Sequence, residues 1–365
     1  MAEESKVYYT DAAIEGIGQD KTLPMKFKRI LDKYPLAEMV AKKSVAIKMH
    51  FGTGYGFSTI HPLFVKILVN ELKTAGARSI KILDMGIQNA IPRGYTNEVI
   101  GCSIVSTFGE SNKYYYKEPI GFKTVDEVLF GGEAVDCDFF IDLSHVKGHG
   151  DCGFGAAIKN IAMGVIHPIS RGKLHQVEGG IDYDKSKCDY CLKCKKACQR
   201  EVIIANNKEK KIGFFYHHCT YCQHCVLVCP NKAITMNERD FENFSRAMAI
   251  VTGRFLKKFE PKNLLFINFL MNITMLCDCW GITSPSLVPD IGILVSDNIY
   301  AIEKQTLDMI KTEDLLPKSL IKPFTLQEKG SHLFEKIHGK DPYLMVNFLP
   351  EYYDCNKNYE VLEVH

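Results

Sequence analysis

The 365-residue chain has almost no excess of charge of either sign. It contains 45 Lys and Arg against 43 Asp and Glu, for a formal net charge of +2. Such a balanced surface provides no general electrostatic attraction to nucleic acid or to an anionic membrane. We therefore expect no nucleic-acid partner, and any partner has to be inferred from the chemistry of individual sites.

Long hydrophobic runs are also missing. The longest apolar stretch, Leu264 to Leu276, has thirteen residues and includes Asn268 and Asn272, whereas a membrane-spanning helix needs about 20 apolar residues. The first residues lack a basic segment followed by an apolar one, so no secretory signal is expected. We expect no membrane span and interpret the stretch as a buried strand.

The dinucleotide-binding fingerprint G-x-G-x-x-G is absent from the glycine-rich loop that His50 and His61 flank. This loop, HFGTGYGFSTIH, carries Gly52, Gly54 and Gly56 at a different spacing. Nicotinamide binding by that route is therefore not supported. A phosphate or carboxylate held on backbone N–H groups at the start of the following helix stays open.

Strands alternate with helices on both sides of the middle of the chain. An apolar strand from Ser44, a helix from Pro62 to Ala75 and a strand from Ser79 form one βαβ unit. Two more strand–helix pairs lie at 138–144 with 154–163 and at 290–295 with 299–311. This order predicts an α/β fold with a parallel or mixed sheet flanked by helices.

The periodicity stops between residues 179 and 237, where Cys, Lys, Asn and Gly dominate. We interpret 179–237 as a small domain inserted at a loop of a discontinuous α/β domain, which comprises residues 1–178 and 238–365. The run from Arg239 to Lys258 predicts an amphipathic helix that leads back to the sheet.

Eight of the fourteen cysteines form two motifs of spacing C-x2-C-x2-C-x3-C inside this segment. Bacterial ferredoxins that hold two 4Fe-4S clusters have this spacing, and the fourth cysteine of each motif ligates the other cluster. The spacing therefore predicts a ferredoxin-like domain with two 4Fe-4S clusters. The predicted ligands are Cys188, Cys191, Cys194 and Cys229 for one cluster and Cys219, Cys222, Cys225 and Cys198 for the other.

Other readings of the two cysteine motifs stay open. Zinc sites usually combine two C-x-x-C pairs at wider separation, and the clusters could also serve only to hold the insert together. Gln199 stands where the ferredoxin pattern has a proline after Cys198, while Pro230 follows Cys229 as expected. Because both cysteines are kept, this affects the turn more than the ligation.

Cluster chemistry predicts a cytoplasmic location, in an anaerobic or well-protected cell.

The segment SHVKGHGDCGFGAAIKN, residues 144–160, follows a predicted strand and so lies at the carboxyl edge of the sheet, where open α/β folds bind ligands. It carries His145, Lys147 and His149, and His50 follows the first strand in the same way. Histidine can donate protons near neutral pH, and lysine can hold an anion. We predict these four residues as catalytic candidates; the alternative is that they are solvated loop residues. A lysine such as Lys159 commonly packs its aliphatic stem against apolar residues and extends its ammonium group to water, without a functional role.

Cys277-Asp278-Cys279 is a further candidate site. Thiols one residue apart cannot both point inward from a strand, so they can ligate together only from a loop. They predict an additional metal ion, with Cys152 as a third ligand, or a redox dithiol near the clusters. The alternative is that they are buried free cysteines.

Several of these motifs together resemble the iron-sulfur centre proteins of the domain-of-unknown-function 362 family. The similar segments are KMHFG with the following HP, SHVKGHGDCGFGAAIKNIAMG, Arg171 to Lys173, the two-cluster insert, CDC and PDIGILVSDN. The resemblance runs from about Ser44 to the C-terminus and implies an iron-sulfur oxidoreductase of an anaerobic bacterium or archaeon. The loop of Gly, His and Lys is also similar to the N-terminal domain of nickel-pincer lactate racemases, in which histidines and a lysine serve catalysis.

We therefore expect an oxidoreductase that moves single electrons between a redox partner protein, a ferredoxin or reductase, and a small-molecule substrate or metal in the α/β crevice. Two alternatives stay open. One is a non-catalytic electron carrier, whose function is set by the cluster potentials. The other is a racemase-like or isomerase-like enzyme in which the clusters are structural.

Overall fold

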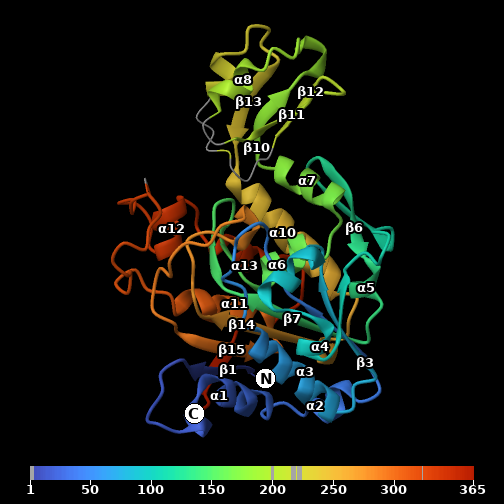
Figure 1. Cartoon of the computed structure of the whole chain (residues 1–365), viewed down its shortest axis with the longest axis vertical. Coiled ribbons are helices and arrows are strands. Elements are labelled where there is room, and N and C mark those ends of the chain that lie inside the picture. The colour runs from blue at the N-terminus through green and yellow to red at the C-terminus, as the bar shows by residue number, and fades with distance from the viewer. Residues whose placement is uncertain (1–3, 199–200, 215–218, 220–223, 323) are drawn as a thin grey trace.

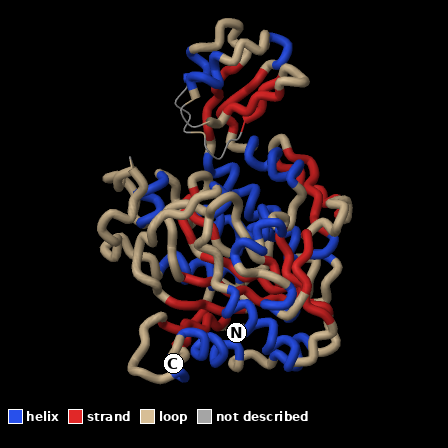
Figure 2. The backbone as a smooth tube through the Cα atoms, in the orientation of Figure 1, coloured by secondary structure: helices blue, strands red, loops and turns tan. Residues whose placement is uncertain are grey.

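The computed structural model of the chain describes residues 4–198, 201–214, 219, 224–322 and 324–365. Its centre is one eight-stranded sheet (Figures 1 and 2). In spatial order the strands are β16 (Tyr359–Glu363), β1 (Ser5–Asp11), β15 (Gly292–Ser296), β14 (Leu264–Leu270), β7 (Phe139–His145), β2 (Ser44–Lys48), β3 (Ser79–Asp84) and β4 (Ser103–Ser106).

Neighbouring strands of this sheet are parallel except at β15, which runs antiparallel to both β1 and β14. The prediction of an α/β fold with a parallel or mixed sheet is thus confirmed, and the sheet is mixed and mostly parallel. β7 and β14 are buried at every residue, because parallel strands of this kind are covered on both faces. The apolar run from Leu264 does begin with a buried strand.

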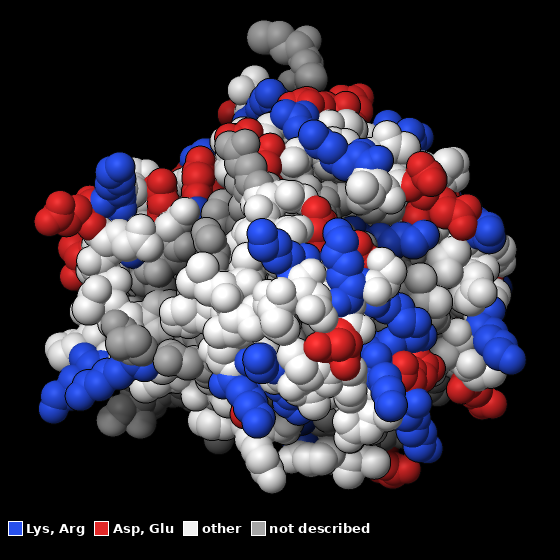
Figure 3. All heavy atoms as spheres, turned by 90° about the horizontal axis from the view of Figure 1, so that it is seen from above, with Lys and Arg blue, Asp and Glu red and all other residues white. Residues whose placement is uncertain are grey.

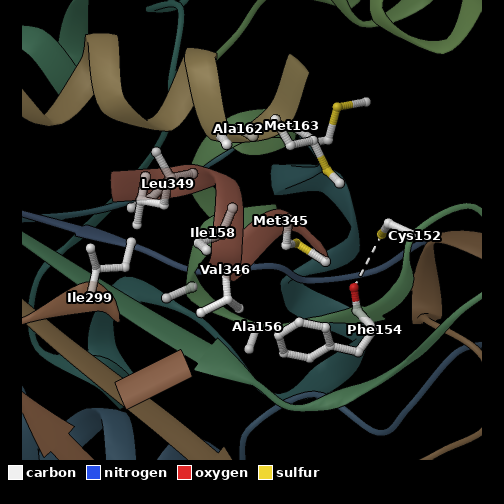
Figure 4. Close-up of a cluster of buried hydrophobic side chains, with 14 of the residues drawn as sticks. Cys152, Phe154, Ala156, Ile158, Ala162, Met163, Ile299, Met345, Val346 and Leu349 are labelled. Carbon is white, nitrogen blue, oxygen red and sulfur yellow. Dashed lines mark hydrogen bonds between the residues drawn. The ribbon is translucent and has the colours of Figure 1, made fainter. Parts of the chain in front are cut away.

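Helices cover both faces of the sheet, and side chains alternate between the two layers. Ile47 of β2 packs into one hydrophobic cluster and its neighbour Ala46 into the other. The first layer contains α1 (Leu23–Leu31), α2 (Leu36–Val40) and α3 (Pro62–Thr74). The second contains α6 (Ala157–Gly164), α10 (Phe241–Leu256), α11 (Ile299–Asp308) and α13 (Leu344–Phe348), and Figure 4 shows part of its core.

The βαβ unit predicted from Ser44 is present as β2, α3 and β3, and the helix predicted from Arg239 to Lys258 is present as α10. The remaining helices of the α/β part are α4 (Asn97–Ile100), α5 (Gly132–Val135), α7 (Pro168–Gln176) and α12 (Leu333–His338). Two hairpins pair β5 (Tyr115–Phe122) with β6 (Val125–Gly131) and β8 (Lys147–His149) with β9 (Gly153–Gly155). Short 3-10 helices lie at Gln19–Lys21, Ile87–Asn89, Ile91–Arg93, Lys185–Lys187, Pro261–Asn263, Asp278–Trp280 and Leu349–Glu351.

Residues 179 to 239 stand at one end of the molecule, beyond α7 and the start of α10 (Figure 1). There β10 (Gly179–Tyr183) pairs with β13 (Ile234–Arg239) and β11 (Ile203–Asn206) with β12 (Lys211–Phe214), both antiparallel, beside α8 (Lys193–Ala197) and α9 (His224–Leu227). This segment has its own hydrophobic cluster of Ile181, Cys194, Ile203, Ile212 and Ile234. That it is a ferredoxin-like domain with boundaries at 179 and 237 stays a prediction.

Basic and acidic side chains are interspersed over the face seen from this end (Figure 3), as the near-neutral composition predicts. Among the residues that the structure describes, no helix is both long enough and apolar enough to cross a bilayer.

Candidate functional site

A cavity of about 240 Å³ lies at the carboxyl ends of the parallel strands. Strands β2 and β3, the loop after β7, helices α6 and α7, and the Cys277 loop all contribute to its wall. Open α/β sheets bind ligands at this edge. The ionisable residues of the wall are Lys48, His50, Asp84, Lys147, Lys159, Arg171, Cys277 and Cys279.

A buried ion pair forms the base of the cavity. Lys48 ends β2 and Asp84 ends the neighbouring β3, so their side chains meet at one edge of the sheet, with Lys48 Nζ 3.2 Å from Asp84 Oδ1. Lys48 Nζ also donates to Asn160 Oδ1 at 3.1 Å, and the Phe51 N–H donates to Asp84 Oδ2 at 2.9 Å. Burial would raise the pKa of Asp84, but Lys48, His50 and the Phe51 N–H hold it well below its usual range. The carboxylate is therefore a fixed negative charge.

His50 stands above this carboxylate. Its Nδ1 lies 3.6 Å from Asp84 Oδ2, and its buried Nε2 has no hydrogen-bond partner in the part of the chain that the structure describes. Burial disfavours the protonated ring, but the contacts with Asp84 and Cys277 outweigh burial and raise the pKa of His50. The ring can therefore hold a proton beside the cavity at near-neutral pH.

The Cys277 loop is joined by hydrogen bonds to the glycine-rich loop that follows β2. The Thr53 N–H donates to the Asp278 carbonyl at 3.0 Å, and Ser58 Oγ donates to Asp278 Oδ1 at 2.5 Å. Gly52 has a φ of +72°, and a Cβ at this position would lie 2.6 Å from the Cβ of Asp278. The close approach of the two loops therefore requires glycine here.

The pKa values of the two thiols of this loop are shifted in opposite directions. Cys277 Sγ accepts from the Cys279 N–H at 3.4 Å, and Lys159 Nζ lies 3.9 Å from the same sulfur. The interaction with the Cys279 thiol, supported by Lys159 and Lys147, outweighs burial and holds the pKa of Cys277 well below its usual range. The Cys277 sulfur and burial raise the pKa of Cys279. The surroundings therefore favour the thiolate form at Cys277 over that at Cys279.

His149, Cys277 and Cys279 form a group that could hold a metal ion. One ligand atom of each lies within 4.8 Å of the others, and His149 Nε2 is 3.7 Å from Cys279 Sγ. In the part of the chain that the structure describes, no other group of His, Cys, Asp or Glu is as compact. Cys152, which we predicted as a third ligand, is not in this group: its Sγ donates to the Phe154 carbonyl at 3.1 Å inside a hydrophobic cluster (Figure 4), and burial raises its pKa.

The predicted catalytic residues of the 144–160 segment face different ways. His145 Nε2 lies 2.9 Å from the carbonyl of Met271, and burial lowers the pKa of His145 to about 4. This histidine lines a second cavity, of about 440 Å³, together with His61. Lys147 lines the first cavity and donates to the His145 carbonyl at 2.6 Å. The structure therefore brings His50 and Lys147 together, places His149 against the thiols and separates His145 from them.

The sequence reasoning missed Lys48, Asp84 and Arg171. The first two had a local signal, because each is a charged residue that ends an otherwise apolar strand, SVAIK and SIKILD. Arg171, on α7, was noted only within the Arg171 to Lys173 segment of the family resemblance and not as a site residue. Its Nε is buried at the wall of the cavity, with no hydrogen-bond partner among the described residues. Lys159, interpreted as a snorkelling side chain, lies at the cavity beside Cys277.

The structure describes seven of the eight cysteines of the predicted clusters. Cys188, Cys191, Cys194 and Cys229 line one hollow. The fourth cysteine of each motif makes the same contact, since Cys198 Sγ accepts from the Val202 N–H at 3.3 Å and Cys229 Sγ from the Ala233 N–H at 3.2 Å. Cys198, Cys219 and Cys225 pack against the small hydrophobic cluster, while Cys222 lies outside the described residues.

Fold and site together define a cysteine-rich α/β protein with a charged cavity and a candidate metal-ligand group. The chain belongs to the family described as domain of unknown function 362 (DUF362), whose model matches residues 45–308. No curated protein matches the chain.

The solved structures that are similar to this chain include the following two. One is the lactate racemase apoprotein from Thermoanaerobacterium thermosaccharolyticum, with 15% identity over 73% of this chain and 51% of that one, and a TM-score of 0.35. The other is a structural-genomics protein from Thermotoga maritima, with 13% identity over 70% of this chain and 52% of that one, and a TM-score of 0.37. The chain spans about half the length of each.

Proposed function

We propose that this protein is an iron-sulfur oxidoreductase of the cytoplasm. In this proposal residues 179–237 form a ferredoxin-like insert with two 4Fe-4S clusters, which accept single electrons from a redox partner protein, a ferredoxin or reductase. The electrons pass to a small molecule or metal ion in the cavity of the α/β part. The cavity contains acidic, basic and cationic side chains, which a catalysed reaction needs. A simple electron carrier does not need them, so the cavity favours an enzyme over a carrier.

The observation that carries the proposal is the hollow between Cys188, Cys191, Cys194 and Cys229. Three of these cysteines are consecutive members of the first motif, and the fourth comes from the end of the second. Two-cluster ferredoxins divide their ligands between clusters in this way. The residues present therefore fit a 4Fe-4S cluster, and the shared contact of Cys198 and Cys229 supports a second, equivalent site.

The order of the cysteines supports clusters over single zinc ions. Zinc sites usually combine two C-x-x-C pairs at wider separation, whereas the hollow is lined by three cysteines of one motif and the last cysteine of the other.

The residues of the cavity have separate roles in this proposal. Asp84 fixes His50, whose raised pKa makes it a proton donor to a reduced substrate. Lys147 and Lys159 hold negative charge on that substrate. His149 with Cys277 and Cys279 binds an additional metal or, as a dithiol, exchanges electrons. His149 Nδ1 accepts from the Asp151 N–H at 3.2 Å, so metal binding through Nε2 would require a proton on Nδ1 and would lengthen this contact.

The test is anaerobic purification followed by analysis of iron, zinc and acid-labile sulfide, and electron paramagnetic resonance after reduction. We expect about eight irons and eight sulfides per chain. Cys229→Ser should lose up to about half of the iron, whereas Cys102→Ser, a free cysteine of the α/β part, should keep all of it. Zinc without labile sulfide, or equal iron in both variants, would contradict the proposal.

A further inference from the structure

The cavity contains more positive charge than its own residues neutralise. Lys48 pairs with Asp84, and Lys159 lies beside the Cys277 sulfur. For Lys147 and Arg171, no carboxylate lies within 4.0 Å among the residues that the structure describes. Because charges removed from water need a counter-charge, the wall of the cavity is built to receive an anion.

Arg171 is the clearest feature of this kind. Its side chain reaches the cavity from α7, and its buried Nε makes no hydrogen bond within the described part of the chain. A guanidinium group presents parallel N–H donors that match the two oxygens of a carboxylate. An arginine whose donors are free inside a cavity is therefore prepared for a bidentate oxyanion.

The two lysines flank Gly155. A Cβ at Gly155 would lie 3.6 Å from Lys159 Cδ and 3.8 Å from Lys147 Cε, so the two side chains run past the same small residue. Lys147 is 5% exposed, and among the described residues it donates one hydrogen bond, to the His145 carbonyl. Two of its ammonium protons therefore remain for a ligand.

We propose that this cavity binds a small organic carboxylate, held by the Arg171 guanidinium and the Lys147–Lys159 pair, beside the Cys277 sulfur and the unpartnered Nε2 of His50. The proposal names the substrate class of the oxidoreductase and rests on that proposed function. The volume of about 240 Å³ lies below the roughly 300 to 1,000 Å³ of sites for drug-sized ligands, so the acid is a small one.

The experiment measures binding and requires no turnover. Anaerobic full-length protein, with its iron content measured in the same sample, is titrated at constant ionic strength with acetate, oxalate, succinate and inorganic phosphate by calorimetry. We expect saturable binding of at least one of the three carboxylates. Arg171→Gln should weaken it about tenfold or more, the loss expected for a charge-assisted bidentate contact.

Lys173→Gln is the matched control, because Lys173 is a basic residue of the same helix that is exposed and does not line the cavity. It should leave the affinity unchanged. Arg171→Lys keeps the positive charge but loses the paired N–H donors of the guanidinium group, so it should give an intermediate affinity. It also provides a second test if the Arg171→Gln protein does not fold.

Binding of phosphate alone, equal affinity of the Arg171→Gln and Lys173→Gln proteins, or no saturable binding of any carboxylate would overturn the inference. A sample that lacks iron and still binds a carboxylate would contradict only the proposed electron transfer. The experiment therefore distinguishes a failure of the carboxylate proposal from a failure of the proposed electron transfer.

Discussion

Lys48 has close neighbours on several sides in the cavity wall. Its side chain is fully buried, its ammonium meets Asp84 and Asn160, and it passes directly over Gly164 at the end of α6. A buried ion pair adds little net stability, because desolvation offsets the attraction. Its contribution is to fix the position of the charge beneath His50, which makes the packing around Lys48 functionally important.

Gly164→Ala should therefore disturb the cavity. A Cβ at this position would lie 2.3 Å from Lys48 Cε and 2.7 Å from Nζ, and the ion pair prevents the lysine from moving away. We expect a loss of about 1 to 3 kcal/mol in the free energy of unfolding, measured by urea denaturation.

Gly172→Ala is the control for that substitution. Gly172 lies within α7, and no heavy atom lies within 4 Å of a Cβ placed there. Alanine should stabilise this helix by about 0.5 to 1 kcal/mol. If the two variants had the same stability, the close packing of Lys48 against Gly164 would be wrong.

The sequence predicted the location of the site at the sheet edge better than it predicted which residues line the cavity. Motif position placed His50 and Lys147 at the carboxyl edge of the sheet, and both line the cavity. It could not distinguish them from His145, because the direction of a side chain in a loop depends on which carbonyls are near, here those of Met271 and Asn272. Arg171 lies on a helix about 120 residues away from His50 in the sequence. No local sequence pattern predicts that residues so far apart line the same cavity.

Among the elements, α6 depends on a carboxyl group from another helix. Glu303 of α11 accepts from the N–H groups of Ala157 at 2.8 Å and Ile158 at 3.3 Å, the first residues of α6. Asn268 of β14 donates to the same carboxyl at 3.2 Å. The arrangement satisfies two N–H groups that a helix start leaves free, and it holds in place the helix that carries Lys159.

Burial raises the pKa of Glu303 to about 7, and this makes stability depend on pH. The folded protein keeps a proton on Glu303 between pH 4.5 and 7, whereas the unfolded chain has already lost it. The free energy of unfolding should therefore be highest at the acidic end and fall as the pH rises to about 7. Glu303 contributes at most about 1.4 kcal/mol per pH unit, or about 3 kcal/mol in total.

Glu303→Gln should remove that part of the slope. The measurement is urea unfolding at several pH values from 5 to 8.5, with Glu38→Gln on the exposed surface of α2 as the control. Asp142, whose pKa burial raises to about 8 with a smaller contribution from Glu303, adds a slope of the same sign. This slope stays in the Glu38 variant and becomes smaller in the Glu303 variant, which adds to the expected loss of slope. An unchanged slope in the Glu303 variant would contradict the prediction.

The elements that the sequence predicted are those with strong local patterns. The apolar runs of β2, β3, β7 and β14 and the amphipathic α3 and α10 are present near their predicted positions. The antiparallel direction of β15 and the strands β1 and β16 were not predicted. β16 lies at one edge of the sheet and β1 is its neighbour. Both strands have mixed, partly exposed residues, and their pairing joins the two ends of the chain. Such pairing depends on contacts that no short window contains.

For the whole molecule, the hydrophobic cores are very unequal. The two main clusters span both faces of the sheet, whereas the described part of the 179–239 segment has five buried residues in its cluster. A segment of about 60 residues with so small a core is marginal without a metal or disulfide to support it. In the proposed function, the clusters supply that support.

Removal of the clusters should therefore unfold this segment and leave the α/β part intact. After treatment with chelator and oxidant under anaerobic conditions, we expect trypsin to cleave first at lysines between residues 185 and 211, at least about tenfold faster than in the untreated protein, since local unfolding exposes them. The fragments should stay associated, because β7 and β2 from one side of the cuts pair through β14 with β15 and α11 from the other. Mass spectrometry identifies the cleavage sites, and cleavage within α3 or α11 at the same rate would instead show that the clusters stabilise the whole molecule.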